Sequence, residues 1–235
     1  MRSGSAHVTE LAQDFGVSEM TVRRDLRELA REGKLERVRG GAVNVGFERP
    51  FEETARERHA AKDRVGAAAA GLVADGQTVM IDIGTTTLQA ARHLHGRDIT
   101  VVTTSLAVYE ELLPDPAIEL LLPGGVVRRI YRSLVGVLAE DSLRQLKADV
   151  LFLGTSGVDA ELAVWDSTIV EVPIKRAMIA AADRVVLLAD AEKFSMGGIV
   201  RVCEAGAIDH IVTDPALPPA ARAAIDEAGI EVTIA

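Results

Sequence analysis

Short apolar runs that alternate with helical patterns dominate the chain from residue 78 to its end. Seven runs have the length and aliphatic content of buried strands: 78–83, 99–103, 118–122, 150–154, 185–189, 210–213 and 231–234. Apolar spacing predicts helices at 60–74, 86–94, 106–113, 138–147, 172–182 and 219–227. This alternation predicts an α/β fold with a parallel, doubly wound sheet.

The first of these strands runs directly into a turn rich in hydroxyl side chains. The apolar run ends at Gly84, and Thr85, Thr86 and Thr87 open the next helix. Such a turn offers unpaired backbone N–H groups, the positive end of a helix dipole and neutral donors. The turn therefore suits an anion such as a phosphate. Threonines that only cap the helix are the alternative.

Polar residues follow most of the predicted strands. Ligands of doubly wound sheets bind beyond the carboxyl ends of the strands, so these residues form the candidate ligand site. Among them, Asp82 could hold sugar hydroxyls or transfer protons. The predicted set is Asp82, Gly84, Thr85, Thr86, Thr87, Ser105, Gly124, Gly125, Lys175, Asp190 and Lys193. Any one of these clusters could consist of turn residues only.

Other charged residues leave alternatives open. Arg128, Arg129 and Arg132 could contact a phosphate or simply face solvent. His93 and His95 are two residues apart on a predicted helix and cannot share a face. We therefore expect no metal site and no cofactor.

The N-terminal region differs in charge from the rest of the chain. Residues 1–50 hold nine Lys or Arg against eight Asp or Glu, whereas the whole chain has a net charge of −9. The window from Arg23 to Arg39 has seven basic and four acidic residues. An acidic body with a locally basic N-terminal module is compatible with DNA contact confined to that module.

The local pattern of this module predicts a winged helix-turn-helix. Helices are expected at 10–15 and 19–32, joined by a tight turn, with Ser18 as the second N-cap. In the second helix an apolar stripe lies opposite Arg24, as a helix that reads the DNA major groove requires. A hairpin at 35–43 could place Arg37 or Arg39 on phosphates. The alternative is a helical protein-interaction module.

The combination of two short strings is more specific. Thr21-Val22-Arg23-Arg24-Asp25-Leu26 and Arg39-Gly40-Gly41-Ala42 together resemble the winged helix-turn-helix of DeoR-type bacterial transcriptional regulators. That resemblance implies that the main DNA contacts are Ser18, Thr21, Arg23 and Arg24. In that family another helix precedes this point, so we expect a module that lacks its first helix.

The second region resembles the effector domain of the same family, which is similar in fold to ribose-5-phosphate isomerase and glucosamine-6-phosphate deaminase. The resemblance rests on strings of the predicted sheet edge: Asp82-x-Gly84-Thr85-Thr86-Thr87, Thr103-Thr104-Ser105-Leu106, Pro123-Gly124-Gly125, Lys175-Arg176-Ala177-Met178 and Leu188-Ala189-Asp190-x-x-Lys193-Phe194. It implies a regulator of sugar metabolism genes, most simply a repressor. Its expected partners are an operator DNA, a phosphorylated sugar effector and further copies of itself.

We therefore expect a DNA-binding domain at 1–45, a linker at 46–59 and an effector-sensing domain at 60–235. One rival is a phosphosugar isomerase or deaminase that transfers protons with Asp82, Asp190 and Lys193. Another is a DNA-binding protein with a degenerate sensor. No apolar run approaches the roughly 20 residues of a membrane span, and the single cysteine, Cys203, suits a reducing cytosol. A cytoplasmic location follows as an expectation.

Overall fold

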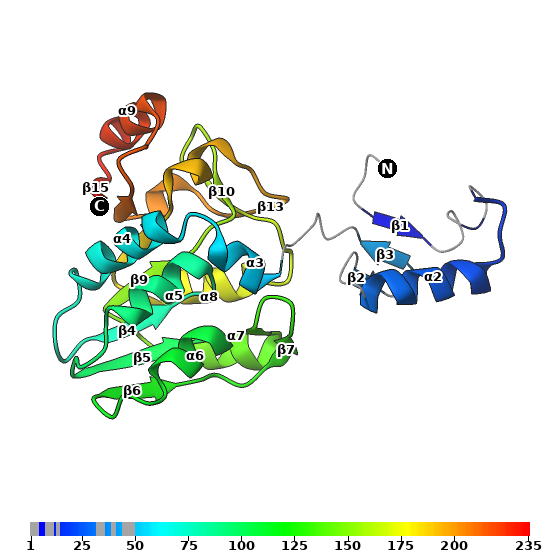
Figure 1. The fold of residues 1–235 in the computed structure, drawn as a ribbon, viewed down its shortest axis with the longest axis horizontal. Coiled ribbons are helices and arrows are strands. Elements are labelled where there is room, and N and C mark those ends of the chain that lie inside the picture. Colours follow the sequence, from blue (N-terminus) through cyan, green and yellow to red (C-terminus); the bar gives the residue numbers. More distant parts are fainter. Residues whose placement is uncertain (1–4, 8–11, 13–14, 32–35, 39–40, 44–49) are drawn as a thin grey trace. The chain divides into compact units, whose positions relative to one another are not determined.

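The computed structural model of the chain describes residues 5–7, 12, 15–31, 36–38, 41–43 and 50–235. The chain divides into two compact units, Met1–Arg49 and Pro50–Ala235, which are taken in turn (Figure 1).

The described part of the first unit contains one helix and a small antiparallel sheet. The elements are α2 (Glu19–Arg31), β1 (Ser5–His7), β2 (Glu36–Val38) and β3 (Gly41–Val43). The sheet order is β1-β3-β2, so β2 and β3 form the predicted hairpin. Of the helix predicted at 10–15, only residues 12 and 15 are described, and both are helical.

The second unit is built on a seven-stranded sheet, and the predicted doubly wound sheet is confirmed. Its strands are β4 (Thr78–Ile81), β5 (Ile99–Thr103), β6 (Ile118–Leu121), β9 (Val150–Leu153), β12 (Val185–Leu188), β14 (His210–Thr213) and β15 (Glu231–Ile234). The order is β15-β14-β12-β9-β4-β5-β6, and every neighbouring pair is parallel.

Seven helices accompany the sheet in residues 50–235: α3 (Phe51–Arg56), α4 (His59–Ala70), α5 (Thr85–Arg92), α6 (Leu106–Leu112), α7 (Val137–Leu143), α8 (Val172–Ala181) and α9 (Pro219–Ala228). Two 3-10 turns, η1 (Ala191–Ser195) and η2 (Ala205–Ala207), follow β12 and β13. A hairpin of β7 (Val126–Arg128) and β8 (Ser133–Val135), and a small sheet of β10 (Gly157–Val158), β11 (Val164–Asp166) and β13 (Val200–Cys203), were not predicted. Four of these strands have only two or three residues, and the four-residue β13 contains the charged Arg201, so none shows the continuous apolar run that marks the strands of the large sheet.

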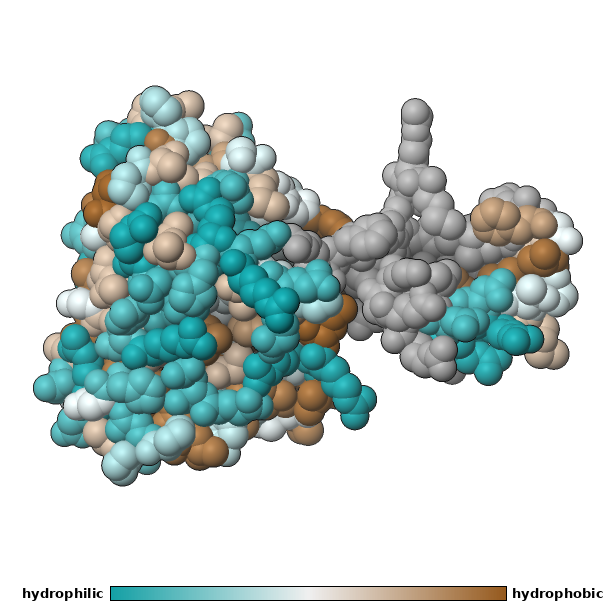
Figure 2. All heavy atoms as spheres, in the orientation of Figure 1, coloured by the Kyte–Doolittle hydropathy of each residue, from teal (hydrophilic) through white to brown (hydrophobic). Residues whose placement is uncertain are grey.

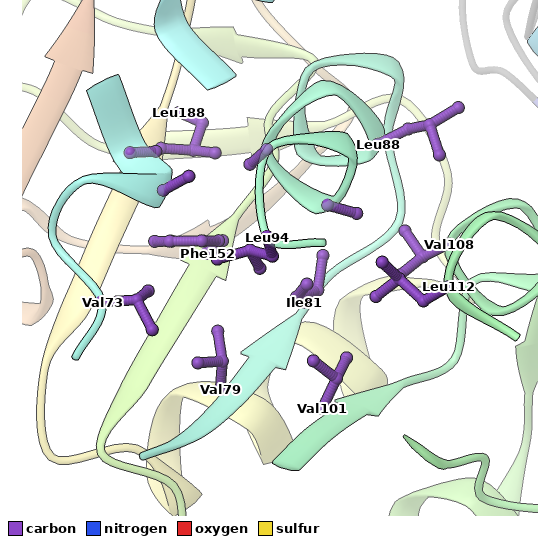
Figure 3. Close-up of a cluster of buried hydrophobic side chains, with 14 of the residues drawn as sticks. Val73, Val79, Ile81, Leu88, Leu94, Val101, Val108, Leu112, Phe152 and Leu188 are labelled. Carbon is purple, nitrogen blue, oxygen red and sulfur yellow. The ribbon is translucent and has the colours of Figure 1, made fainter. Parts of the chain in front are cut away.

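Side chains that alternate across the strands fill two apolar layers, one on each face of the sheet. Along β4, Val79 and Ile81 enter the layer beneath α4, α5 and α6, where they lie near Phe152 of β9 (Figure 3). Met80 enters the opposite layer with side chains of α7 and α8. All four side chains are fully buried. This alternation fixes the register of the central strands, because a shift by one residue would exchange the two faces.

The direction in which the chain crosses the sheet reverses between β4 and β9. From β4 the chain proceeds outward to β5 and β6, and it then returns to place β9 on the other side of β4. The carboxyl ends of β4 and β9 approach closely here, since a Cβ at Gly154 would lie 2.6 Å from the Ile83 carbonyl oxygen. This is the topological switch point, where ligands of such sheets bind.

The linker predicted at 46–59 does not hold for residues 50–59, because this segment belongs to the second unit. Phe51 on α3 is 2% exposed, and its ring lies 5.5 Å from that of Tyr131 in an edge-on contact. Its backbone N–H donates to the Ile130 carbonyl at 3.0 Å. This segment was predicted to be a linker because a helix of only six residues that follows Pro50 shows no clear apolar period. Residues 46–49 of the predicted linker lie outside the described residues.

Hydrophilic residues cover most of the second-unit face shown in Figure 2. Among the described residues no helix is both long enough and apolar enough to cross a membrane.

Candidate functional site

Helix α2 has one buried side and one exposed side. Val22 and Leu26 are 5% and 6% exposed, whereas Thr21, Arg23 and Arg24 face solvent. This is the division predicted from the spacing of 100° per residue. The basic side of α2 is therefore available to a partner.

The exposed side chains of α2 differ in how they are held. Arg23 Nη2 donates to Glu19 Oε2 at 2.8 Å, and Arg27 Nε donates to the Arg23 carbonyl at 3.1 Å. Within the described residues the Arg24 side chain makes neither a hydrogen bond nor an ion pair. Its guanidinium N–H groups thus remain free to donate to a partner.

Ser18 has the capping geometry that the sequence predicted. Its Oγ accepts from the backbone N–H of Thr21 at 3.1 Å and lies 2.9 Å from Thr21 Oγ1. These contacts satisfy one of the free N–H groups at the start of α2 and fix both hydroxyls on the exposed side. Arg39, predicted to contact phosphates from the wing, lies outside the described residues.

In the second unit, the turn after β4 forms the N-terminus of α5. Gly84 is its N-cap with φ 144°, a conformation that L side chains rarely adopt. Thr87 Oγ1 donates to the Gly84 carbonyl at 3.0 Å and so holds the turn. The hydroxyls of Thr85 and Thr86 have no hydrogen-bond partner within residues 50–235. Two hydroxyls and the helix N-terminus are thus available for an anion.

Next to this turn lies a buried ion pair at the switch point. Lys175 Nζ donates to Asp82 Oδ2 and, at 3.0 Å, to the Gly154 carbonyl. The Gly154 N–H also donates to Asp82 Oδ2, at 3.0 Å. The Asp82 and Lys175 side chains are 0% and 2% exposed, so their charges persist only because each is paired and hydrogen-bonded.

Two further carboxyls surround Lys175. Asp166 Oδ2 lies 3.5 Å from its Nζ, and Glu171 lies one helical turn before it on the chain. Burial would lower the pKa of Lys175, but Asp82, Asp166 and Glu171 outweigh that effect and raise it. Lys175 therefore carries a positive charge throughout the neutral range.

Glu171 has its own set of donors. Arg128 Nη1 and Ser133 Oγ both donate to its Oε1, the latter at 2.5 Å. Burial raises the pKa of Glu171 to about 7, although Arg128, Ser133 and Lys175 act in the opposite direction. Near neutral pH this carboxyl is therefore close to half protonated. We call Asp82, Asp166, Glu171, Lys175, Arg128 and Ser133 the switch-point cluster.

Comparison with known proteins identifies both units. The DeoR C terminal sensor domain family matches residues 57–215, and the DeoR-like helix-turn-helix domain family matches residues 1–45. The HTH-type transcriptional regulator GlpR of Haloferax volcanii is 35% identical, over 98% of this chain and 91% of that protein. The chain belongs to the DeoR family. The transcriptional repressor AccR of Agrobacterium fabrum is also similar, with 33% identity over 88% of this chain and 82% of its own.

This DeoR-family chain is accordingly a DNA-binding transcriptional regulator. A solved structure of ribose 5-phosphate isomerase A from Methanocaldococcus jannaschii overlaps with 57% of this chain and 53% of that chain. The overlap has 18% sequence identity and a TM-score of 0.42.

The structure of the DeoR-family sensor brings together only part of the predicted ligand site. Asp82 and Lys175 are in contact, and the turn from Gly84 to Thr87 follows Asp82 directly. The backbone of Ser105 forms an isolated antiparallel β-bridge with that of Ser133, which belongs to the switch-point cluster. Ser105 is also the N-cap of α6, and its Oγ accepts from the Val108 N–H.

Of the predicted glycine pair, only Gly125 has a packing role. Gly125 lies against β8, since a Cβ there would be 2.9 Å from the Val135 carbonyl oxygen, and a Cβ at Gly124 would meet nothing within 4 Å. Within residues 50–235 no hydrogen bond or ion pair connects this pair to Asp82.

Asp190 and Lys193 are also separate from Asp82. Asp190 accepts from the Glu192 N–H as the cap of η1, and its Oδ1 lies 3.5 Å from Arg58 Nε. Arg58 Nη2 also donates to Asp214 at 2.6 Å. No hydrogen bond or ion pair in residues 50–235 joins Asp190 or Lys193 to Asp82, so the three groups of the rival enzyme mechanism are not in direct contact.

Several residues of this DeoR-family site escaped the sequence analysis. Arg128 had been left open between a ligand contact and a solvated charge, and it instead pairs with buried Glu171. Glu171 itself precedes Pro173, which marks the start of α8, and an acidic residue at that position is a signal that could have found it. Asp166 lies in a strand of three residues and offers no such signal.

Among the described residues no group of three or more His, Cys, Asp or Glu side chains could hold a metal ion. His93 instead contacts Asp63 at 2.9 Å, and His95 contacts Asp115 at 2.9 Å.

Proposed function

We propose that this chain is a repressor whose second unit binds a phosphorylated sugar and whose winged helix then releases the operator. The observation that carries the proposal is the position of the Gly84–Thr87 turn. It places a helix N-terminus with two unengaged hydroxyls directly beside the buried Asp82–Lys175 pair at the switch point.

The two parts of this site suit the two ends of a sugar phosphate. The backbone N–H groups at the start of α5 and the hydroxyls of Thr85 and Thr86 would bind the phosphate. All of these donors are neutral, so no lysine or arginine side chain would have to be buried at the phosphate. Asp82 and Lys175 would orient the sugar. Asp190 and Lys193 lie beyond the direct contacts of Asp82 and would act from the end of β12, two strands away from β4.

On the DNA side, Ser18, Thr21, Arg23 and Arg24 would contact the operator, with Arg39 on the wing. A single short reading helix gives little specificity, so we propose a homo-oligomer that presents two or more of them to matching half-sites. To move a population from mostly bound to mostly released, the effector must favour the released form by a few kcal/mol.

The decisive experiment is fluorescence anisotropy with DNA from upstream of the chain's own gene, at two salt concentrations, with and without a panel of sugar phosphates. Specific, salt-sensitive binding that one sugar phosphate relieves would support the proposal. Turnover of a sugar phosphate by the chain would instead favour the alternative function, that of a phosphosugar isomerase or deaminase.

A variant at Thr86 locates the phosphate. Thr86→Glu should abolish the response to the effector and leave DNA affinity unchanged, because the new carboxylate would repel the phosphate. Thr86→Ser, which keeps the hydroxyl, should retain the response. Gln145→Glu adds the same charge at an exposed position of the turn that follows α7, and it serves as the matched control. An unimpaired response in Thr86→Glu would place the phosphate elsewhere.

A further inference from the structure

The hairpin of β7 and β8 has a free strand edge that is apolar. Among the described strands β7 pairs only with β8, and no backbone hydrogen bond outside that pair involves Val126 or Val127. Both side chains are more than half exposed. An exposed apolar edge is a template for pairing with another strand, and a sheet of two strands is only marginally stable by itself. β7 therefore offers an edge on which a further strand can pair.

The two outer strands of the large sheet are protected in a way that β7 is not. β6 carries the exposed Glu119, and β15 carries Glu231, whose side chain is 67% exposed. A charge on an edge strand opposes pairing with a second copy, because like charges would meet. The charged residue of β7 is Arg128, and its guanidinium binds the buried Glu171. Of these three edges, only that of β7 lacks a charge directed to solvent.

The start of α7 extends the apolar surface of β7. Helix α7 lies beside β7 (Figure 1), and a Cβ at Gly136, the N-cap of α7, would lie 3.8 Å from Val126 Cγ2. Val137 and Leu138 on the first turn of α7 are 64% and 68% exposed. We call Val126, Val127, Val137 and Leu138 the β7–α7 patch. Contiguous apolar patches on a protein surface mark sites of contact with another molecule.

Charged residues of opposite sign flank this patch. Arg129 follows β7, is exposed, and makes neither a hydrogen bond nor an ion pair within residues 50–235. On α7, the side chain of Asp141 is 58% exposed and also contacts Arg144. Gly125 lies against this helix, since a Cβ there would be 3.3 Å from Ala139 Cβ. The patch thus has a cation at one end of β7 and a carboxylate beside the other end.

We propose that the β7–α7 patch is the contact surface with a second copy of this chain, and that the two β7 strands pair antiparallel about a twofold axis at Val127. In this register Val127 lies opposite Val127 of the second copy, and Val126 lies opposite its Arg128. Arg129 comes beside Gly125 of the second copy, on the side where that copy's α7 carries Asp141. Opposite charges therefore meet twice, once on each side of the axis, and like charges do not.

The charges and the symmetry favour a second copy over a different protein. The chain carries a net charge of −9, so two copies repel each other over most of their surface. The β7–α7 patch is an exception, because it joins an uncharged strand edge to a cation and a carboxylate that complement themselves under a twofold rotation. This inference rests on the homo-oligomer of the proposed function, for which it names the contact surface.

Analytical ultracentrifugation of the full chain, without DNA or effector, tests the inference. The wild-type chain should sediment as a dimer or a larger oligomer. Val127→Lys places two like charges on the axis and should raise the dissociation constant of this contact about a hundredfold. Ile234→Lys introduces the same charge on the edge strand β15, at a side chain that is 43% exposed. It is the matched control and should leave the oligomer unchanged.

Exchange of the flanking charges tests the pairing across the axis. Arg129→Glu places a carboxylate beside that of Asp141 and should weaken the oligomer about tenfold. Arg129→Glu combined with Asp141→Lys restores opposite charges and should recover most of the affinity. An equal loss in the single and double variants would overturn the proposed register.

Disulfide cross-linking tests the register directly. Val127→Cys, in a chain that also carries Cys203→Ser, places two thiols opposite each other. Opposed Cα atoms of antiparallel strands are about 4.5–5.5 Å apart, which is within disulfide range, so oxidation should give a covalent dimer. Val126→Cys places the thiols on diagonal positions roughly 7–8 Å apart, and it should cross-link far less. Equal cross-linking of the two variants would overturn the register.

The outcomes separate this inference from the proposed function. An oligomer that Val127→Lys leaves intact, or that Ile234→Lys dissociates, would overturn the inference and leave the regulator and its effector site standing. A monomeric wild-type chain would overturn the inference together with the homo-oligomer on which it rests. A chain that forms the β7 contact and binds no sugar phosphate would support the inference, and only the proposed function would fail. Circular dichroism checks that Val127→Lys folds, and the cross-linking of Val127→Cys decides the matter if it does not.

Discussion

Helix α2 and the switch-point cluster use charged side chains in opposite ways. On α2 the side chains of Arg23, Arg24 and Arg27 face solvent, and Arg23, which is 53% accessible, pairs with Glu19. In the cluster Lys175 and Asp82 are almost completely buried. Exposed charges cost little and remain free for a partner, whereas buried charges persist only where the fold pairs them. The exposed charges of α2 thus remain available to a partner, whereas the buried charges of the cluster depend on one another.

Loss of one partner of the buried pair should produce the largest effect. Lys175→Met leaves the Asp82 carboxylate buried without its cation, so the free energy of unfolding should fall by about 3–5 kcal/mol. Urea denaturation measures the change. Lys147→Met removes a lysine that is 75% exposed and pairs with Asp183, and it should cost about 1 kcal/mol or less. Similar losses in the two variants would contradict the contrast between buried and exposed charges.

Burial of a charge should also make the free energy of unfolding depend on pH, through the carboxyl of Glu171. The pKa of this carboxyl is about 7 in the folded chain, above its ordinary value of 4.5, so its protonated form stabilises the fold. That stability is complete below pH 4.5 and is lost as the pH rises through 7. Relative to Glu171→Gln, which cannot ionise, the wild-type chain should lose roughly 2–3 kcal/mol between pH 5 and pH 8.

Urea denaturation of both chains at the two pH values measures this difference. Other titrating groups are common to the two chains and cancel in the comparison. A difference that stays constant from pH 5 to pH 8 would mean that Glu171 does not titrate in this range.

On the exposed side, Arg24→Ala should weaken DNA binding by about 1–3 kcal/mol and leave effector binding intact. Arg24 has no intramolecular partner among the described residues, so the chain loses little stability. Fluorescence anisotropy and calorimetry measure the two affinities. Arg222→Ala, on exposed α9, is the matched control. An equal loss of DNA and effector binding in Arg24→Ala would indicate misfolding instead.

The smallest effect concerns the cap of α2. Ser18→Ala removes the acceptor for the Thr21 N–H and should destabilise the helix by about 1 kcal/mol. Faster amide hydrogen exchange along α2 would show this loss. Ser142→Ala on α7 removes a hydroxyl that only donates to the Leu138 carbonyl, and it should change exchange less. Equal effects would mean that Ser18 does not act as a cap.

The sequence predicted the sheet well because burial on both faces leaves a strong signal. A strand such as β9, with Leu151 and Phe152 both fully buried, reads as a continuous apolar run. Asp82 could be predicted as a site residue because it follows such a strand and comes shortly before Gly84. Elements of three residues, such as β7 and β11, leave no comparable signal, so Asp166 was missed and the role of Arg128 was left open.

Asp190 shows a second limit of sequence reasoning. Both Asp82 and Asp190 follow buried strands, and the rule that ligands bind at strand ends treats them alike. They differ only in their tertiary partners. Arg58, which adopts a left-handed backbone conformation at φ 50° between α3 and α4, reaches Asp190 and Asp214. No local pattern reveals which of two aspartates receives an arginine from a distant helix connection.

The parallel pairing of β4 with β9 has a consequence for the order in which the regulator is made. The helix-turn-helix domain at residues 1–45 is translated first, whereas Asp82 meets Gly154 and Lys175 only after more than half of the chain has been added. At roughly 5–20 residues per second, a ribosome needs on the order of ten seconds to pass from the winged helix to Lys175. Each new molecule therefore completes its helix-turn-helix domain well before the switch-point cluster can form.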